Sequence, residues 1–189
     1  MISVRRARPA DAVAMGAVHV AVWRNAYATI LSPEFLAHLS VPRCAAHYDA
    51  SIRTGVGVYV ATASGLDNPA GLAPRLIGFA SATRPRAMFE RDERLAEGEI
   101  ETLYVLDDWR ERGVGRRLMR AAAGHLAEIG CRSAYLWVLR DNPSRWFYER
   151  LGGRAVAQGW TMVDYQQVMK MAYVWDPIEQ LLQASPQAS

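Results

Sequence analysis

The feature that most constrains this chain is Trp109–Leu118, a stretch in which a strand-like segment passes through a turn into a helix. A strand is expected at residues 98–106, and residues 116–129 carry apolar side chains at helical spacing. Gly113 and Gly115 stand at the junction. Without side chains, they let an anion approach the backbone, where first-turn N–H groups and the helix dipole favour negative charge. The stretch therefore predicts a phosphate-binding turn.

Two common phosphate-binding motifs do not fit this stretch. The dinucleotide fingerprint needs a third glycine where Leu118 stands, and a phosphate loop needs a Gly-Lys-Ser/Thr sequence that is absent. Two glycines alone are weak evidence, because many helices begin with glycine for steric reasons.

The pattern that remains, Arg110-x-x-Gly113-x-Gly115 after the strand at residues 99–105, resembles the acetyl-CoA motif of the GNAT superfamily of N-acetyltransferases. A second segment, at residues 142–152, is similar to the late Asn, Phe-Tyr and glycine block of that superfamily. Two motifs in this order, about 30 residues apart, are unlikely by chance. The resemblance extends more loosely over the chain to about Trp175 and implies a twisted mixed sheet that is splayed at the acetyl-CoA site.

The remaining patterns predict strands and helices in the order β, α, α, β, β, β, α, β, α, β, β. This is an α/β (α+β) domain with about six to seven strands flanked by about four helices. Strands are expected at residues 2–7, 57–62, 76–83, 98–106, 134–139 and 166–175. One helix is expected to begin at Ala12 with Asp11 as its N-cap, and a second after Ser32-Pro33. A third is expected at residues 116–129, with Leu118, Ala122, Leu126 and Ile129 on its core face. A fourth is expected from Asn142-Pro143 to Gly152.

Connecting loops are expected at residues 64–75 and 84–97. Residues 1–175 form the expected N-acetyltransferase domain, and residues 176–189 a frayed tail or short helix.

Composition limits the function classes. The chain has 189 residues, 51% of them hydrophobic, which suits one domain. Its net charge of +3 comes from scattered arginines, so we expect no nucleic-acid partner. No apolar run of about 18 residues occurs, so we expect a cytoplasmic protein without a membrane partner. Cys44 and Cys131 lack ligand spacing, so we expect no metal.

The resemblance implies acetyl-CoA as co-substrate. The pantetheine arm would lie along the backbone of Leu103 and Val105, with an N–H near Leu103 polarising the acetyl carbonyl. The backbone N–H groups implied for the pyrophosphate are those of Arg112, Gly113, Val114, Gly115 and Arg116. The side chains of Arg110, Arg112, Arg116 or Arg117 would add charge, although spacing does not tell which of them point inward.

Acyl transfer to an amine needs a base for the amine and an acid for the departing thiolate. Strand alternation puts Glu99 and Glu101 on one face with Leu103 and Val105, so either carboxylate is a candidate base, directly or through water, or a solvated strand carboxylate. Tyr148 matches the family tyrosine that protonates the thiolate. Its alternative is an aromatic packed at a helix end, on a different face from the expected core stripe of Phe147 and Leu151.

The acceptor site is less defined. Asn142 is either a helix cap or a cofactor contact. Trp23, Tyr27 and Phe35 match the region that walls the acceptor site in the superfamily, although such aromatics also form cores. The four histidines are expected to be structural or at the surface.

The leading hypothesis is a monomeric or homodimeric enzyme that acetylates a primary amine on a small cationic molecule, such as a polyamine, aminoglycoside or amino-acid derivative. A protein N-terminus or lysine as acceptor, and a non-catalytic acyl-CoA sensor, remain open.

Overall fold

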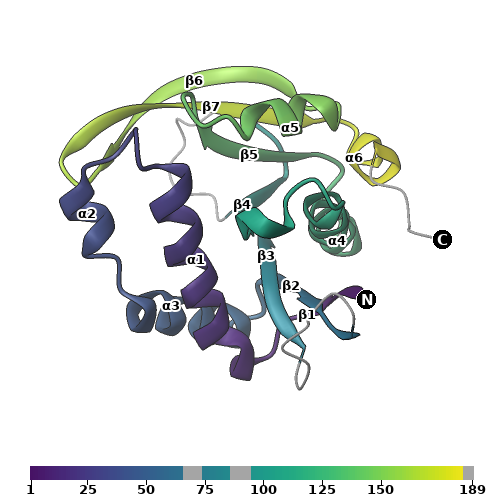
Figure 1. Ribbon diagram of the computed structural model, residues 1–189. Coiled ribbons are helices and arrows are strands. Elements are labelled where there is room, and N and C mark those ends of the chain that lie inside the picture. The colour runs from purple at the N-terminus through teal and green to yellow at the C-terminus, as the bar shows by residue number, and fades with distance from the viewer. Residues whose placement is uncertain (66–73, 86–94, 185–189) are drawn as a thin grey trace.

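A computed structural model describes residues 1–65, 74–85 and 95–184 and contains one seven-stranded sheet in the order β1-β2-β3-β4-β5-β7-β6 (Figure 1). Only the β4–β5 pair is parallel among the neighbours, so the sheet is mixed, as predicted. The strands are β1 (Ile2–Arg6), β2 (Gly57–Ala63), β3 (Arg75–Thr83), β4 (Gly98–Val105), β5 (Ala134–Leu139), β6 (Arg154–Val163) and β7 (Gln166–Trp175). The sequence located all of them except β6.

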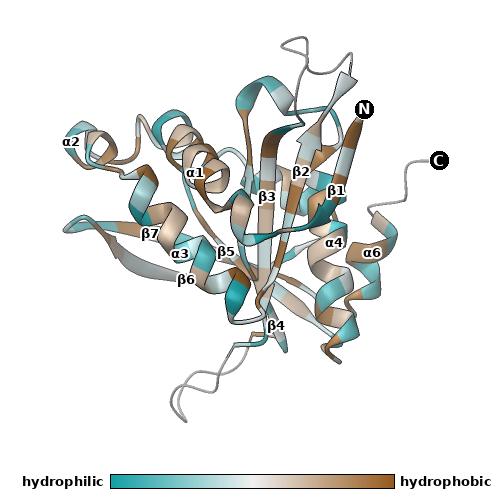
Figure 2. Ribbon diagram, turned by 90° about the horizontal axis from the view of Figure 1, so that it is seen from below, coloured by the Kyte–Doolittle hydropathy of each residue, from teal (hydrophilic) through white to brown (hydrophobic). Residues whose placement is uncertain are grey.

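Helices cover both faces of the sheet. They are α1 (Ala12–Ala26), α2 (Pro33–Ala37), α3 (Val41–Arg53), α4 (Val114–Glu128), α5 (Arg145–Arg150) and α6 (Glu179–Ala184). Figure 2 shows α1 and α3 on one side of strands β1–β3, and α4 and α6 on the other. The sequence missed α3, and α6 realises the short helix that was one of two expectations for the C-terminal segment. Ile178 and Leu181 are buried in the core there.

Helix α1 does not bury all of its apolar side chains. Val13 is 68% exposed, whereas Met15, Val18 and Val22 are buried. The buried face is set by α3, which crosses so closely that a Cβ on Gly16 would lie 2.7 Å from the Val41 carbonyl oxygen.

The expected cap of α1 is also absent. The Asp11 carboxylate makes no cap hydrogen bond to α1 and instead binds the Arg5 guanidinium at 2.7 and 2.8 Å.

Helix α4 fills the opposite layer. Leu118, Ala122 and Leu126 are fully buried, as predicted, but Ile129 is 39% exposed because α4 ends at Glu128 and Gly130 turns the chain away at φ +82°.

Strands β4 and β5 separate soon after they begin. Their register contains two pairs, Gly98–Ala134 and Glu99–Tyr135, and β5 then continues beside β7. The predicted splay is confirmed.

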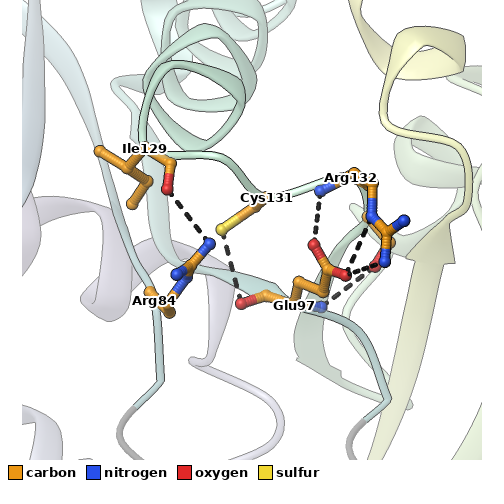
Figure 3. A network of polar contacts seen from close by, with 6 residues as sticks. Arg84, Glu97, Ile129, Cys131 and Arg132 are labelled. Atoms are coloured by element: carbon orange, nitrogen blue, oxygen red, sulfur yellow. Dashed lines mark hydrogen bonds and ion pairs between the residues drawn. The ribbon is translucent and has the colours of Figure 1, made fainter.

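A polar network holds the closed end of this splay (Figure 3). The Glu97 carboxylate accepts hydrogen bonds from the Arg132 backbone N–H at 2.8 Å and from its guanidinium at 3.0 Å. Arg84 donates to the Ile129 carbonyl at 3.1 Å, which ties the end of β3 to the same turn. Because these contacts fix where β4 and β5 meet, they also set where the strands begin to diverge.

Two expected loops fall partly outside the described residues, at 66–73 and 86–94. In the ranges that are described, no helix has the length and apolar character needed to cross a membrane.

Candidate active site

A cavity of about 690 Å³ lies where β4 and β5 diverge. Helix α1, strands β4 and β5, the turn before α4, and α5 all contribute to its walls. The predicted site residues that line it are Trp23, Tyr27, Glu101, Leu103, Val105, Arg110, Gly113, Gly115, Arg116, Asn142 and Tyr148. Glu99, Phe35, Arg112 and Val114 do not line it. The fold thus brings two motifs and the N-terminal aromatics to one place.

The turn before α4 has the geometry of an anion cradle. Gly113 is the N-cap of α4 at φ +77°, a conformation that favours glycine, and no side chain caps the first turn. A Cβ on Gly115 would lie 3.1 Å from Phe147 Cζ, so the absence of that side chain leaves room beside the ring. First-turn N–H groups without a side-chain partner are available to a phosphate.

The arginines around this turn divide into two groups. Arg110 and Arg116 line the cavity, although Arg110 also pairs with Asp107 at 2.8 Å and Arg116 also donates to the Ala184 carbonyl at 3.2 Å. Arg112 instead lies over the Trp109 ring at 5.0 Å, and Arg117 donates to the Ile2 carbonyl at 2.9 Å. The structure therefore directs the Arg112 and Arg117 side chains to other partners, which the spacing did not reveal.

The backbone of β4 offers hydrogen-bonding groups to the cavity. The Leu106 N–H donates to the Ile77 carbonyl of β3 at 2.9 Å. Because alternate residues of an antiparallel strand turn their backbone groups to the same neighbour, Leu103 and Val105 turn theirs away from β3, toward the gap left by β5. That arrangement can accept an extended chain as an added strand.

A β-bulge in β4 overturns the predicted sharing of one face. On β3, Ser81 pairs with Thr102 and the next residue pairs with Ile100, so Glu101 is an extra residue. The bulge reverses the alternation beyond it: Leu103 and Val105 pack with the α4 layer, whereas Glu101 turns to Ser81 on the α1 side.

The two candidate carboxylates have different surroundings. Glu99 accepts a hydrogen bond from the Tyr135 hydroxyl at 2.8 Å and lies outside the cavity lining. Glu101 lines the cavity, 3.3 Å from Ser81 Oγ. Loss of water around Glu101, and next the charge of Glu99, raise the pKa of its carboxyl, while the Ser81 hydrogen bond and His47 oppose this rise. Glu101 therefore combines a place in the cavity lining with a raised carboxyl pKa.

Tyr148 is buried, at 7% exposure, and lines the cavity. Tyr148 belongs to the same core cluster as Leu151, and Phe147 packs half-buried against it, so the expected separation of Tyr148 from the stripe of Phe147 and Leu151 is not found. No hydrogen bond to the Tyr148 hydroxyl comes from any residue in the described part of the chain. Burial raises the pKa of this phenol, so it stays protonated at neutral pH.

The N-terminal aromatics form one wall. Asn142 Nδ2 donates to the Tyr27 hydroxyl at 3.2 Å, and Trp23 Nε1 donates to the Tyr104 hydroxyl at 2.9 Å. Asn142 precedes α5, whose N-cap is Ser144, and its Oδ1 accepts the Ser144 N–H at 2.9 Å, so it supports the turn rather than capping the helix. Phe35 packs in the cluster with Leu31 and Leu36 instead of at the cavity.

None of the four histidines lines the cavity. His19 shares a hydrogen bond with the Tyr48 hydroxyl at 2.7 Å, and burial, with His47 second, lowers its pKa to about 4. His19 is therefore neutral at pH 7 and acts in packing.

Several residues that line the cavity were not named from the sequence, among them Tyr104, Trp137 and Lys170. Tyr104 and Trp137 resemble ordinary strand aromatics in the sequence. For Lys170 the single available signal is that it is the chain's only lysine.

Comparisons with known proteins match most of this chain to one family. The family model described as "Acetyltransferase (GNAT) family" matches residues 30–153. The N-acetyltransferase YuaI of Bacillus subtilis, which is uncharacterised, is 29% identical over 158 residues, covering 84% of this chain and 83% of YuaI.

Among solved structures, the PaiA N-acetyltransferase of Thermoplasma acidophilum in complex with coenzyme A has a TM-score of 0.64 at 18% identity, covering 90% of this chain and 98% of PaiA. YncA of Salmonella typhimurium with its cofactor acetyl-CoA has a TM-score of 0.63 at 17% identity, covering 93% of each chain.

Proposed function

Since this chain belongs to the acetyltransferase (GNAT) family, we propose that it transfers the acetyl group of acetyl-CoA to the primary amine of a small cationic molecule by direct attack. The observation that carries this proposal is the meeting of Glu101, Tyr148 and the Gly113–Arg116 turn in one cavity. A base, an acid and an anion cradle are the parts that this reaction needs.

The residues of the cavity fit acetyl-CoA in three respects. The turn at Gly113 offers N–H groups to phosphates, and Arg110 and Arg116 add positive charge. The outward backbone groups of Leu103 and Val105 suit the amides of the pantetheine arm. Tyr148 presents a buried hydroxyl that has no partner among the described residues.

Glu101 accepts the proton that leaves the attacking amine, directly or through water, and Tyr148 donates a proton to the departing thiolate. The backbone N–H near Leu103 polarises the acetyl carbonyl as the C–N bond forms and the C–S bond breaks. The bound co-substrate supplies the acetyl group as a thioester. Afterwards, solvent takes the proton from Glu101 and returns one to Tyr148.

A small acceptor is favoured by the volume of the cavity. About 690 Å³ lies within the range of single small-molecule sites, and part of it is needed for the pantetheine arm. The negative charge of Glu101 attracts a protonated amine.

The test is thiol release from acetyl-CoA against polyamines, aminoglycosides, amino acids and peptides, with acetyl-CoA binding followed by calorimetry. Turnover on small amines supports the proposal. Turnover on peptides alone would give a protein N-terminus or lysine as acceptor, and binding without turnover would indicate a non-catalytic sensor.

A further inference from the structure

The cavity contains a charged residue that the proposed transfer does not use. Lys170 lies on β7 opposite Leu139 of β5 and lines the same cavity as Glu101. The other basic residues of this chain are all arginines: of 22 lysines and arginines together, Lys170 alone is lysine. An ammonium differs from a guanidinium in being a compact point charge rather than a planar fork.

The side chain of Lys170 belongs to the acceptor side of the cavity. Val168, two residues earlier on the same strand face, packs with Tyr27 and Leu36. Leu139, directly opposite Lys170, packs against the same cluster. The cationic side chains Arg110 and Arg116 lie instead at the phosphate turn, and Arg150 comes from α5. Lys170 is therefore separate from the groups that meet the co-substrate.

The ammonium of Lys170 is held over an aromatic ring and has no acidic partner among the described residues. Its Nζ lies 4.1 Å from the centroid of the Trp137 ring, a cation–π contact that restricts where the charge can be. None of the ion pairs within the described residues involves Lys170. A half-buried ammonium that is held over an aromatic ring and lacks an acidic partner is available to pair with an anion that enters the cavity.

We infer that Lys170 binds a carboxylate of the acceptor, so that the acceptor is an amino acid or an amino-acid derivative with a free carboxylate and an apolar side chain. This inference rests on the proposed transfer, in which Glu101 receives the amine. Glu101 and Lys170 then match the two charges of such a molecule, while Trp23, Tyr27 and Trp137 offer aromatic surface to its side chain. Of the three acceptor classes named in the sequence analysis, this selects the amino-acid derivative, whose cationic ammonium faces Glu101; a polyamine or aminoglycoside would bring further positive charge to Lys170 and be repelled.

The first experiment compares acceptors that differ only in the carboxylate: leucine and phenylalanine, their amides, and the corresponding amines without the carboxyl group. One charge-assisted hydrogen bond corresponds to about a 10- to 100-fold difference in kcat/KM. We expect the free acids to be preferred by that factor. Lys170→Met should bring the acid-to-amide ratio close to one, mainly by raising KM for the acid, and Lys170→Arg should keep part of the preference.

The matched control is Arg154→Met, which removes an exposed positive charge from the neighbouring strand β6, outside the cavity. It should leave the acid-to-amide ratio unchanged. Equal use of acids and amides by the wild-type protein, or a preference that survives Lys170→Met, would overturn the inference.

A binding readout separates this inference from the proposed function. Calorimetric titration of leucine and phenylalanine into the CoA-bound protein should give binding that Lys170→Met weakens about 10- to 100-fold. If such binding occurs without turnover of any amine, the transfer proposal fails while the carboxylate site stands. If neither acid binds, the carboxylate site is wrong even where other amines are acetylated.

Discussion

Replacing Tyr148 by phenylalanine should raise the stability of the protein while it lowers the activity. The hydroxyl is buried and has no hydrogen-bond partner in the described ranges. An unsatisfied buried hydroxyl costs about 1–3 kcal/mol, and water that reaches the cavity recovers part of this. We therefore expect Tyr148→Phe to gain about 1 kcal/mol, or roughly 2–4 °C in Tm for a chain of this length.

The effect on turnover has the opposite sign. If Tyr148 protonates the thiolate, its loss should lower kcat by about 10²- to 10⁴-fold, because general acid catalysis contributes that much. Affinity for acetyl-CoA should stay within about twofold, since the ring remains. The assays are steady-state thiol release, calorimetric titration of acetyl-CoA and thermal unfolding.

Tyr173→Phe is the matched control. Tyr173 is also buried, but its hydroxyl donates to Glu149 Oε1 at 2.7 Å, and it is not part of the cavity lining. This variant should lose about 1 kcal/mol of stability and keep kcat. A Tyr148→Phe protein with kcat within twofold of wild type, or with stability lowered like that of Tyr173→Phe, would refute the reasoning.

Three further outcomes follow from the same structure. Glu101→Gln should lower kcat/KM by about 10²-fold or more and remove the fall of kcat/KM at acidic pH, whereas Glu99→Gln should keep that fall. Because the folded-state pKa of Glu101 is raised, ionisation of this carboxyl lowers the stability of the protein as pH rises through that pKa. Thermal unfolding at pH 7 should therefore show Glu101→Gln slightly more stable than wild type. Gly113→Ala should weaken acetyl-CoA binding about 10-fold or more and destabilise by about 1 kcal/mol, because φ is +77° there; unchanged calorimetric affinity would refute the cradle. Glu97→Gln should lower Tm at pH 7, because the hydrogen bonds from Arg132 stabilise the ionised carboxylate and lower its folded-state pKa. The difference in Tm between variant and wild type should vanish as pH falls from about 4.5 through that lowered pKa. A difference in Tm that persists at acidic pH would contradict this.

The parts of the fold that depend on local pattern were predictable. Gly113, Gly115 and Gly130 mark the ends of α4, and its apolar spacing gave the core face through Leu126. The expected order ends with two strands, but the first of them, β6, received no range because it is an edge strand with both faces largely open to solvent, so its apolar alternation is weak. Helix α3 was missed because it buries only Ala45 and Tyr48, although Ser40 accepts the Arg43 N–H as a cap.

The features of the site that the sequence did not reveal arise from pairing between distant strands. The bulge at Glu101 depends on the register with Ser81, and no alternation rule within one strand contains that register. Arg112 is absent from the cavity lining, and its guanidinium lies over the Trp109 ring instead. Lys170 lines the cavity because β7 pairs with β5 and places it opposite Leu139.

The most direct test of the account is the stoichiometry of transfer. Acetyl-CoA carrying a labelled acetyl group is mixed with the protein and an accepted amine, and free thiol, acetylated amine and acetylated protein are counted together by mass spectrometry. The account predicts one thiol for each acetylated amine and no label on the protein, because the amine attacks the thioester directly, with Glu101 as the base and Tyr148 as the acid. Label that accumulates on the protein, or thiol release without an acetylated amine, would contradict it.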